Sequence, residues 1–282
     1  MKNACVIGWP IEHSRSPLIH GYWLNKYGIA GSYTKRVVKP EDVVAFFGSL
    51  ADQGFVGCNV TVPHKEAALA AADWPYDDAK HIGAANTLWL EDGVLCARNT
   101  DMYGYMWNLA DRAPNWGKRD APISIFGAGG AARAIVYGFM NERVGEIRLF
   151  NRSRERAELL ARHFGALVNN KTAIKIYDWE QREEKSRDSR VIVNTTSLGL
   201  KGVGDLGIDF GRHQRECVVS DIVYVPLETA FLRAARLEGL VTVDGLGMLL
   251  HQAVPGFERW FGVRPEVTAE LRAIIEADIV GA

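Results

Sequence analysis

Short apolar segments alternate with longer segments of helical periodicity along almost the whole chain. This alternation is typical of α/β units built around mostly parallel sheets. The first hundred residues contain an Asp92-Gly93 pair, which suits the positive φ of a tight hairpin turn. The elements predicted there are strands at 4–8, 32–38 and 55–62, helices at 17–27 and 40–53, and a hairpin of 85–90 with 94–98.

A polar segment marked by Pro and Gly, residues 112–122, follows a predicted helix at 102–111 and is typical of a domain edge. A second α/β block begins after it. Its predicted elements are strands at 123–126, 147–150, 191–195, 218–222 and 240–243, helices at 131–140, 154–164 and 227–238, and an exposed helix or loop at 178–190. Helical spacing at 248–261 and 266–279 has no strand after it, so we expect these helices to pack back on the first block.

Composition points to a globular protein that binds small molecules. With 282 residues and 48% hydrophobic residues, the chain can bury roughly three quarters of its unfolded surface. Its 33 basic and 34 acidic residues leave a net charge of −1, which argues against nucleic-acid or anionic-membrane partners. No apolar run approaches the roughly 18 residues of a membrane span, and Gly8 and Pro10 break the N-terminal apolar stretch too early for a signal peptide.

The four cysteines lie far apart in the sequence and form no C-x-x-C pair. Free, mostly buried thiols in a reducing cytoplasm are therefore expected. The seven histidines are scattered, so we predict no metal site. Near-zero net charge does not choose between a monomer and a homodimer.

A glycine turn joins the first strand and helix of the second block. Residues 126–132, Phe-Gly-Ala-Gly-Gly-Ala-Ala, fit the pattern G-x-G-x-x-[G/A] in the context that dinucleotide binding requires. Gly127 permits the tight turn, Gly129 lets the backbone approach a pyrophosphate, and Ala132 allows close packing of helix on strand. The helix N-terminus then attracts the phosphate charge.

The segment after the next strand favours NADP over NAD. Many dinucleotide sites place a carboxylate there for the ribose 2′-hydroxyl. This chain has instead Asn151-Arg152-Ser153-Arg154-Glu155-Arg156. Guanidinium groups can grip a 2′-phosphate in bidentate fashion, although some of these arginines could simply solvate the start of a helix.

Polar residues gather at strand ends in the first block. Alternation along 56–62 places Asn59 and Thr61 on one face at the carboxyl end of a strand, where open α/β sheets bind ligands. Pro63 suits the first turn of a following helix, which brings Lys65 beside the same crevice. Taken alone, Asp101 is interpreted as a helix cap, and so is Ser16.

In combination these segments resemble the shikimate dehydrogenases, a family of NADP-dependent enzymes that reduce 3-dehydroshikimate in aromatic amino-acid biosynthesis. The resemblance extends over nearly the full chain, and the order and spacing of its segments are hard to obtain by chance. They are Gly8–Pro17, Asn59–Lys65, Gly83–Thr87, Asn99–Asp101, the glycine turn, Asn151–Ser153, and Gly245 through Met248 to Ala253.

The resemblance implies a set of site residues. Lys65 would be the catalytic acid/base beside Asp101, and Ser14 and Ser16 would hydrogen-bond the substrate carboxylate. Ring hydroxyls would be bound by Thr61, Asn86, Asp101, Tyr224 and Gln252. The implied NADP-binding positions are Gly127, Ala128, Gly129, Gly130, Ala131, Asn151, Arg152, Ser153, Arg156, Ile222 and Gly245. Family spacing singles out Arg152 and Arg156, which leaves Arg154 an ordinary surface role.

The expected architecture is α/β with two domains. An N-terminal substrate-binding domain at 1–103 would be completed by 244–282, and a doubly wound, Rossmann-type NADP-binding domain would occupy 104–243. Two alternatives stay open. One is a quinate/shikimate dehydrogenase that uses NAD, and the other is a non-catalytic NADP-binding sensor that has kept the fold.

Overall fold

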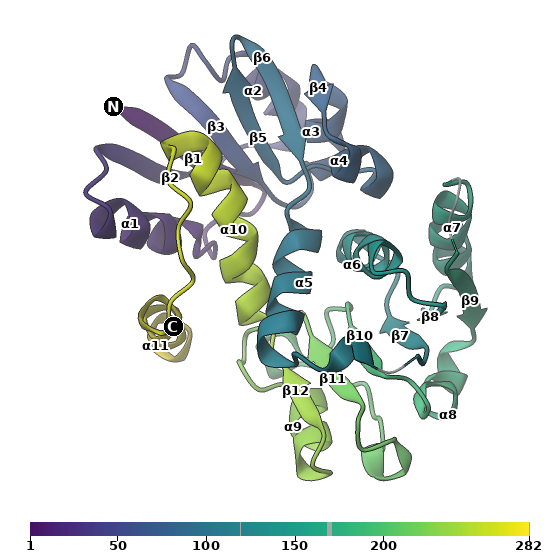
Figure 1. Cartoon of the computed structure of the whole chain (residues 1–282). Helices are drawn as coiled ribbons and strands as arrows, with labels where there is room; N and C mark the ends of the chain where they lie inside the picture. The colour runs from purple at the N-terminus through teal and green to yellow at the C-terminus, as the bar shows by residue number, and fades with distance from the viewer. Residues whose placement is uncertain (119, 168–170, 282) are drawn as a thin grey trace. The chain divides into compact units, whose positions relative to one another are not determined.

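The computed structural model describes residues 1–118, 120–167 and 171–281. The chain divides into two compact units (Figure 1). The first unit comprises residues 1–101 and 250–277, and the second comprises 102–249 and 278–282. Each unit is built around its own six-stranded sheet, so the predicted α/β class is confirmed.

The sheet of the first unit is mixed, with the strand order β2-β1-β3-β5-β6-β4. Strand β1 pairs in parallel with β2 and β3, whereas β5 runs antiparallel to both β3 and β6. The predicted hairpin is therefore present as β5 and β6. The strand bounds are β1 Lys2–Gly8, β2 Gly31–Val37, β3 Phe55–Val60, β4 Trp74–Pro75, β5 Thr87–Glu91 and β6 Val94–Arg98.

Helices cover both faces of this sheet. The helices that follow the first-unit strands are α1 Ser16–Lys26, a 3-10 turn at Pro40–Asp42, α2 Val43–Gly48, α3 Lys65–Ala71 and α4 Asp77–Ile82. Residues of α2, α3 and α4 form one buried cluster with Cys5, Ile7 and Cys58 of the sheet. In Figure 1, α2 lies behind the strands and α10 (Leu246–Phe261) lies in front of them.

The C-terminal helices pack on the first unit, as predicted. The indole nitrogen of Trp260 in α10 donates to the backbone oxygen of Leu88 at 2.9 Å. A Cβ at Gly57 in β3 would collide with this indole, so the glycine admits the helix against the sheet. Before the last helix, α11 (Ala269–Gly281), the backbone oxygen of Glu266 accepts from the indole nitrogen of Trp23 at 3.0 Å.

The sheet of the second unit is parallel, with the order β12-β11-β10-β7-β8-β9. Counted from the first strand of the unit, this is the 3-2-1-4-5-6 order of a Rossmann fold. The strand order reverses between β7 and β10, and ligands of such folds bind at the carboxyl ends beside that reversal. The strand bounds are β7 Ile123–Phe126, β8 Glu146–Phe150, β9 Ala173–Tyr177, β10 Val191–Asn194, β11 Val218–Asp221 and β12 Val241–Val243.

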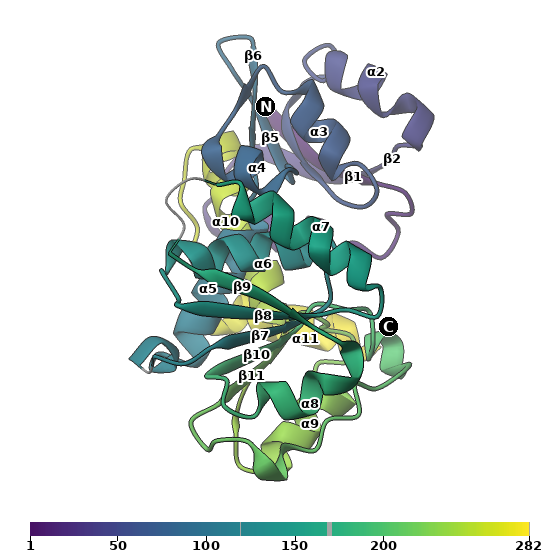
Figure 2. The ribbon, with the colours of Figure 1, turned by 90° about the vertical axis from the view of Figure 1, so that its right-hand side faces the viewer.

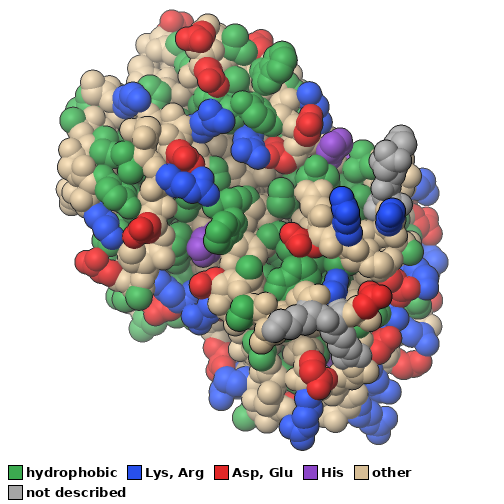
Figure 3. Space-filling model, viewed as in Figure 1, with side chains coloured by type: hydrophobic (Ala, Val, Ile, Leu, Met, Phe, Trp, Pro, Cys, Tyr) green, Lys and Arg blue, Asp and Glu red, His purple; other side chains and the backbone are tan. Residues whose placement is uncertain are grey.

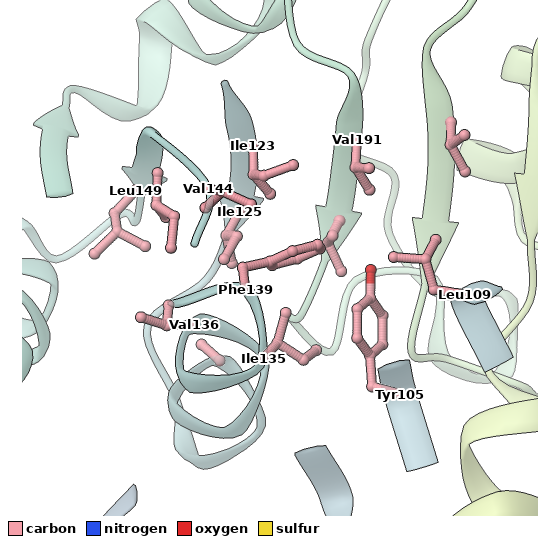
Figure 4. Packing of buried hydrophobic residues seen from close by; sticks show 14 of the residues in the cluster. Tyr105, Leu109, Ile123, Ile125, Ile135, Val136, Phe139, Val144, Leu149 and Val191 are labelled. Atoms are coloured by element: carbon pink, nitrogen blue, oxygen red, sulfur yellow. The ribbon is translucent and has the colours of Figure 1, made fainter. Parts of the chain in front are cut away.

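Both faces of this sheet are buried, which explains the continuous apolar runs of its strands. Ile123 and Ile125 face the cluster that holds α5 (Asp101–Arg112), α6 (Gly130–Asn141) and α7 (Arg154–Gly165), whereas Phe126 faces the cluster that holds α9 (Ala230–Leu237). Figure 2 shows α6 and α7 on one side of the sheet and α8 (Arg182–Ser186) and α9 on the other. Figure 4 shows the α6 side, where Phe139 and Tyr105 pack under Ile125.

Some predicted elements differ from the observed ones. Strand β9 and the short pair β4 and α4 were not predicted. The helix predicted at 40–53 is a 3-10 turn followed by the shorter α2, and the strand predicted at 55–62 ends at Val60. The charged segment 178–190 contains a 3-10 turn and α8, in agreement with its prediction.

Charged side chains of both signs are interspersed on the face drawn in Figure 3, with apolar side chains between them. This mixed pattern matches the net charge of −1. Within the described ranges, no helix has both the length and the apolar character needed to cross a membrane.

Candidate active site

A lysine and an aspartate form an ion pair in the first unit. The amine of Lys65, the first residue of α3, lies 2.5 Å from Oδ2 of Asp101. The backbone N–H of Ala85 donates to the backbone oxygen of Lys65 at 2.9 Å, which ties the start of α3 to the chain leading into β5. The two side chains are 26% and 12% exposed, so a ligand can reach a pair that is largely shielded from water.

Asn86 holds the other carboxylate oxygen of Asp101. Its Nδ2 donates to Oδ1 of Asp101 at 2.8 Å, and its own Oδ1 accepts from the backbone N–H of Thr100 at 2.7 Å. The hydroxyl of Thr87 donates to the same Asn86 oxygen at 3.1 Å. The Thr100 N–H can only donate, so the amide of Asn86 has one possible orientation, with its N–H groups toward Asp101.

The segment before Asp101 is braced by a buried aspartate of α4. Asp78 accepts from Nε of Arg98 at 2.7 Å and from the backbone N–H of Asn99 at 3.0 Å. Asn99 in turn accepts from the backbone N–H of Asp101 at 3.1 Å. The prediction that Asp101 caps a helix is therefore wrong, because α5 begins at Asp101 and its carboxylate is used by Lys65 and Asn86.

The predicted carboxylate-binding serines lie at the start of α1. Ser16 is its first residue and is buried, and the N-cap position is occupied by Arg15. The prediction of Ser16 as an N-cap is wrong, since the helix starts one residue earlier than the Pro17 pattern suggested. Instead, Oγ of Ser14 accepts from the backbone N–H of Ser16 at 3.3 Å.

Thr61 and Asn59 of the predicted pair have different surroundings. Thr61 is half-buried just beyond the end of β3, and a Cβ at Gly8 would lie only 2.6 Å from its Cγ2. Asn59 is buried and bonded to other protein groups, so it is part of the support beneath the site.

The glycine turn of the second unit fits a dinucleotide. Gly127 has φ 110°, and a Cβ there would lie 2.5 Å from Oγ1 of Thr195. A Cβ at Gly129 or Gly130 would meet nothing within 4 Å. Gly129 is the N-cap of α6, and no side chain caps that helix. The open helix terminus, with no side chain at Gly127, Gly129 or Gly130, suits the pyrophosphate of NADP.

The three arginines after β8 differ in their surroundings. Arg154 donates to Asp178 at 2.7 Å and to Glu158 at 3.2 Å. Arg152 and Arg156 are exposed, and in the part of the chain that the structure describes no carboxylate pairs with either. Asn151 shapes this loop by donating from Nδ2 to the backbone oxygen of Ser153 at 2.7 Å. Two guanidinium groups are thus available to a phosphate.

The remaining predicted residues lie in different units. Ile222 and Tyr224 follow β11 in the second unit, and a Cβ at Gly245 would collide with the backbone oxygen of Ile222. Gln252 belongs to the first unit, in α10, where it is buried. Among the predicted residues, the structure joins Lys65, Asn86 and Asp101 into one hydrogen-bonded cluster.

A buried aspartate that the sequence analysis did not single out ends β11. Asp221 accepts from Nδ2 of Asn194 at 2.9 Å, from the backbone N–H of Val223 at 2.9 Å and from the hydroxyl of Thr229 at 2.7 Å. Burial raises the pKa of Asp221 to about 6, against the effect of these three donors. Its two side-chain partners, Asn194 and Thr229, are 27 and 8 residues away in sequence, so no local spacing marks it.

Two family models match the chain. Residues 6–88 match the model described as the shikimate dehydrogenase substrate binding domain. Residues 245–274 match the model described as the shikimate 5'-dehydrogenase C-terminal domain.

Relatives match over the whole length. The shikimate dehydrogenase (NADP(+)) of Brucella abortus strain S19 is 53% identical, with 100% of this chain and 96% of that protein covered. Among solved structures, the Thermus thermophilus shikimate 5-dehydrogenase in complex with NADP(H) and shikimate is 31% identical, with coverage of 100% and 99% and a TM-score of 0.82. The quinate dehydrogenase of Corynebacterium glutamicum in complex with NAD is 27% identical, with coverage of 98% and 99% and a TM-score of 0.90. The chain thus belongs to the shikimate dehydrogenase family.

Proposed function

We propose that this chain is a shikimate dehydrogenase that catalyses the reversible NADPH-dependent reduction of 3-dehydroshikimate to shikimate. The observation that carries the proposal is the Lys65–Asp101 ion pair, whose carboxylate is held on its other side by Asn86. This pair provides a proton donor in a fixed position, which the reduction of a ketone requires. The full-length identity with enzymes of that name supports the choice of substrate.

Lys65 is the acid in the proposed mechanism. Hydride for the carbonyl carbon is the chemistry that NADPH supplies when bound. As negative charge develops on the carbonyl oxygen, the Lys65 ammonium stabilises it and transfers a proton to it. Asp101 orients the ammonium, and in the reverse direction the neutral amine takes the hydroxyl proton back.

Substrate recognition is proposed for the polar residues that the family pattern names. Ser14 and Ser16 bind the carboxylate. Ring hydroxyls are bound by Thr61, Asn86, Asp101, Tyr224 and Gln252. These roles follow the family pattern. Binding a small hydroxylated ring requires hydrogen-bond donors and acceptors at several points, and this set of side chains offers them.

NADP binding is assigned to the second unit, and we place the NADP domain at 104–243 and the substrate domain at 1–103 with 244–282. The pyrophosphate would be held by Gly127, Ala128, Gly129, Gly130 and Ala131, and Ile222 and Gly245 are further proposed cofactor-binding residues. The adenosine 2′-phosphate would be held by Asn151, Arg152, Ser153 and Arg156, since neither arginine is engaged by a carboxylate of the described residues. We place the enzyme in the cytoplasm, where free buried thiols such as those of its four cysteines persist.

Quinate oxidation with NAD is the second candidate, because a quinate dehydrogenase with bound NAD has a similar fold. Purified protein should be tested with shikimate and quinate, each with NADP⁺ and NAD⁺, by absorbance of the reduced nicotinamide. Strong turnover with shikimate and NADP⁺ alone supports the proposal. Comparable turnover with quinate or NAD⁺ moves the protein to the second candidate, and no turnover with any pair leaves a non-catalytic NADP-binding protein.

A further inference from the structure

A buried tyrosine of β2, Tyr33, begins a series of hydrogen bonds that leads to the Lys65–Asp101 pair, and it is not among the residues that the family pattern assigns. The ring of Tyr33 stacks on the imidazole of His20, with centroids 3.9 Å apart and planes 12° apart. The centroid of the Trp260 ring lies 5.8 Å from that of Tyr33, and Tyr33 is 7% exposed. The ring is therefore fixed by packing, and its hydroxyl has a fixed position.

The hydroxyl of Tyr33 donates to Oδ1 of Asn59 at 2.6 Å. The direction of this bond follows from the other end of the amide. Nδ2 of Asn59 faces the backbone oxygen of Asn86 at 3.2 Å, and a carbonyl oxygen can only accept. Burial also raises the pKa of Tyr33, so the phenol keeps the proton that it donates.

The hydrogen-bond network continues from Asn59 to the ion pair. Nδ2 of Asn59 also donates to the hydroxyl of Thr87 at 3.2 Å. The hydroxyl hydrogen of Thr87 is then available to Oδ1 of Asn86, 3.1 Å away. Asn86 donates in turn to Asp101, which holds Lys65. The Thr87 hydroxyl also lies 3.1 Å from Oγ1 of Thr100, which itself donates to the same oxygen of Asn86.

Ser16, one of the proposed carboxylate-binding residues, opposes the rise in the pKa of Tyr33. Ser16 is buried at the first turn of α1, and Asn59 is buried in β3.

We propose that Tyr33 is a positioning residue, whose hydroxyl orders Asn59 and Thr87 beneath Asn86 and through them fixes Asp101 and Lys65. This inference rests on the proposed function for its kinetic test. It also has a structural test that needs no turnover. Loss of the hydroxyl would leave a buried acceptor on Asn59 without its donor, a defect that costs more than a typical hydrogen bond contributes.

The variant Tyr33→Phe keeps the stacked ring and removes only the hydroxyl. The control Tyr22→Phe removes a hydroxyl that bonds Thr268 and Glu270 elsewhere in the same unit. For Tyr33→Phe we expect kcat to fall about tenfold at saturating substrates, with KM for NADP⁺ unchanged. The control should keep the wild-type kcat. Rates are normalised to folded protein by near-UV circular dichroism, so a loss of fold is not counted as a loss of turnover.

The structural test compares side-chain amide resonances in ¹⁵N-labelled protein. If the network transmits the change, Tyr33→Phe shifts the resonances of both Asn59 and Asn86, and Tyr22→Phe shifts neither. A shift at Asn59 alone with an unchanged kcat would overturn the proposal. Should the wild type fail to turn over shikimate, the proposed function fails, yet the Asn86 resonance still decides the role of Tyr33.

A second variant covers the case in which Tyr33→Phe does not fold. Thr87→Val keeps the shape of the side chain and interrupts the same network between Asn59 and Asn86. The same fall in kcat and the same Asn86 shift are expected. A Thr87→Val protein with the wild-type kcat and an unmoved Asn86 resonance would disprove the network.

Discussion

The amine of Lys65 donates to Oδ2 of Asp101 over 2.5 Å, and the two residues come from segments 36 positions apart. Since Asn86 occupies the other oxygen, the carboxylate has one orientation and the lysine amine one preferred place. Fixed geometry of this kind lets a general acid act without first reorganising its surroundings.

Replacement of Lys65 tests its role as the acid. Lys65→Ala should lower kcat by about 10²- to 10⁴-fold, because a positioned proton transfer contributes a factor of that size. KM for shikimate should change less. The matched control is Lys80→Ala, which removes an exposed lysine of α4 whose partner Asp77 lies 3.9 Å away. Steady-state kinetics with shikimate and NADP⁺ measure both variants, and wild-type turnover in Lys65→Ala would exclude the lysine from catalysis.

The arginines after β8 offer an internal comparison. Arg152→Ala and Arg156→Ala should each raise KM for NADP⁺ about tenfold or more, since a hydrogen bond to a charged group contributes roughly 1.5 to 3 kcal/mol. KM for NAD⁺, which has no 2′-phosphate, should barely change. Arg154→Ala is the control, because that guanidinium is already paired with Asp178 and Glu158. An equal effect of all three variants on both cofactors would contradict specific phosphate recognition.

The glycine turn gives a stability prediction. In Gly127→Ala the new Cβ meets Thr195, and the backbone must keep φ 110°, which together cost about 1 to 3 kcal/mol or more. Urea unfolding should show this loss, and calorimetry should show weakened NADP⁺ binding. The control Gly165→Ala lies at the end of α7, where an added Cβ meets nothing within 4 Å. A stable Gly127→Ala protein would mean that the turn adapts to a side chain.

Asp221 predicts a pH dependence of stability. Burial raises its pKa from 3.8 to about 6, so between these values it is protonated when folded and ionised when unfolded. Unfolding then releases a proton, and rising pH therefore favours unfolding within this window. The free energy of unfolding of the wild type, measured relative to Asp221→Asn, should fall by about 3 kcal/mol from pH 4 to above pH 6. Urea titrations at several pH values measure this difference, and a flat difference would contradict the prediction.

The sequence predicted the elements whose burial is uniform. Strand β7 was predicted with its observed bounds, because Ile123–Phe126 is buried on both faces and lies between a polar linker and a glycine turn. Strand β9 was missed because it lies at the edge of its sheet, where Ala173–Tyr177 mixes exposed and half-buried residues. Strand β4 has only two residues and leaves almost no pattern.

The site residues that could be predicted are those whose type and place in the sequence indicate a chemical role. Lys65 and Asp101 follow strand ends and match a family motif, so both could be named from sequence. Tyr33 could not, since its link to Asn59 spans 26 residues and depends on the order of strands in the sheet. Asp221 lies at the end of an apolar strand, and only the fold brings Asn194 and Thr229 to it.

The buried imidazole of His20, which stacks on Tyr33, lowers the stability of the first unit in acid. Burial lowers the pKa of His20 from 6.5 to about 3, so the folded protein excludes a proton that the unfolded chain binds below pH 6.5. Within that window, each unit of falling pH multiplies the ratio of unfolded to folded protein by up to about ten through this ring alone. Proton uptake at a residue with no part in the proposed chemistry thus becomes a driving force for opening the aromatic core.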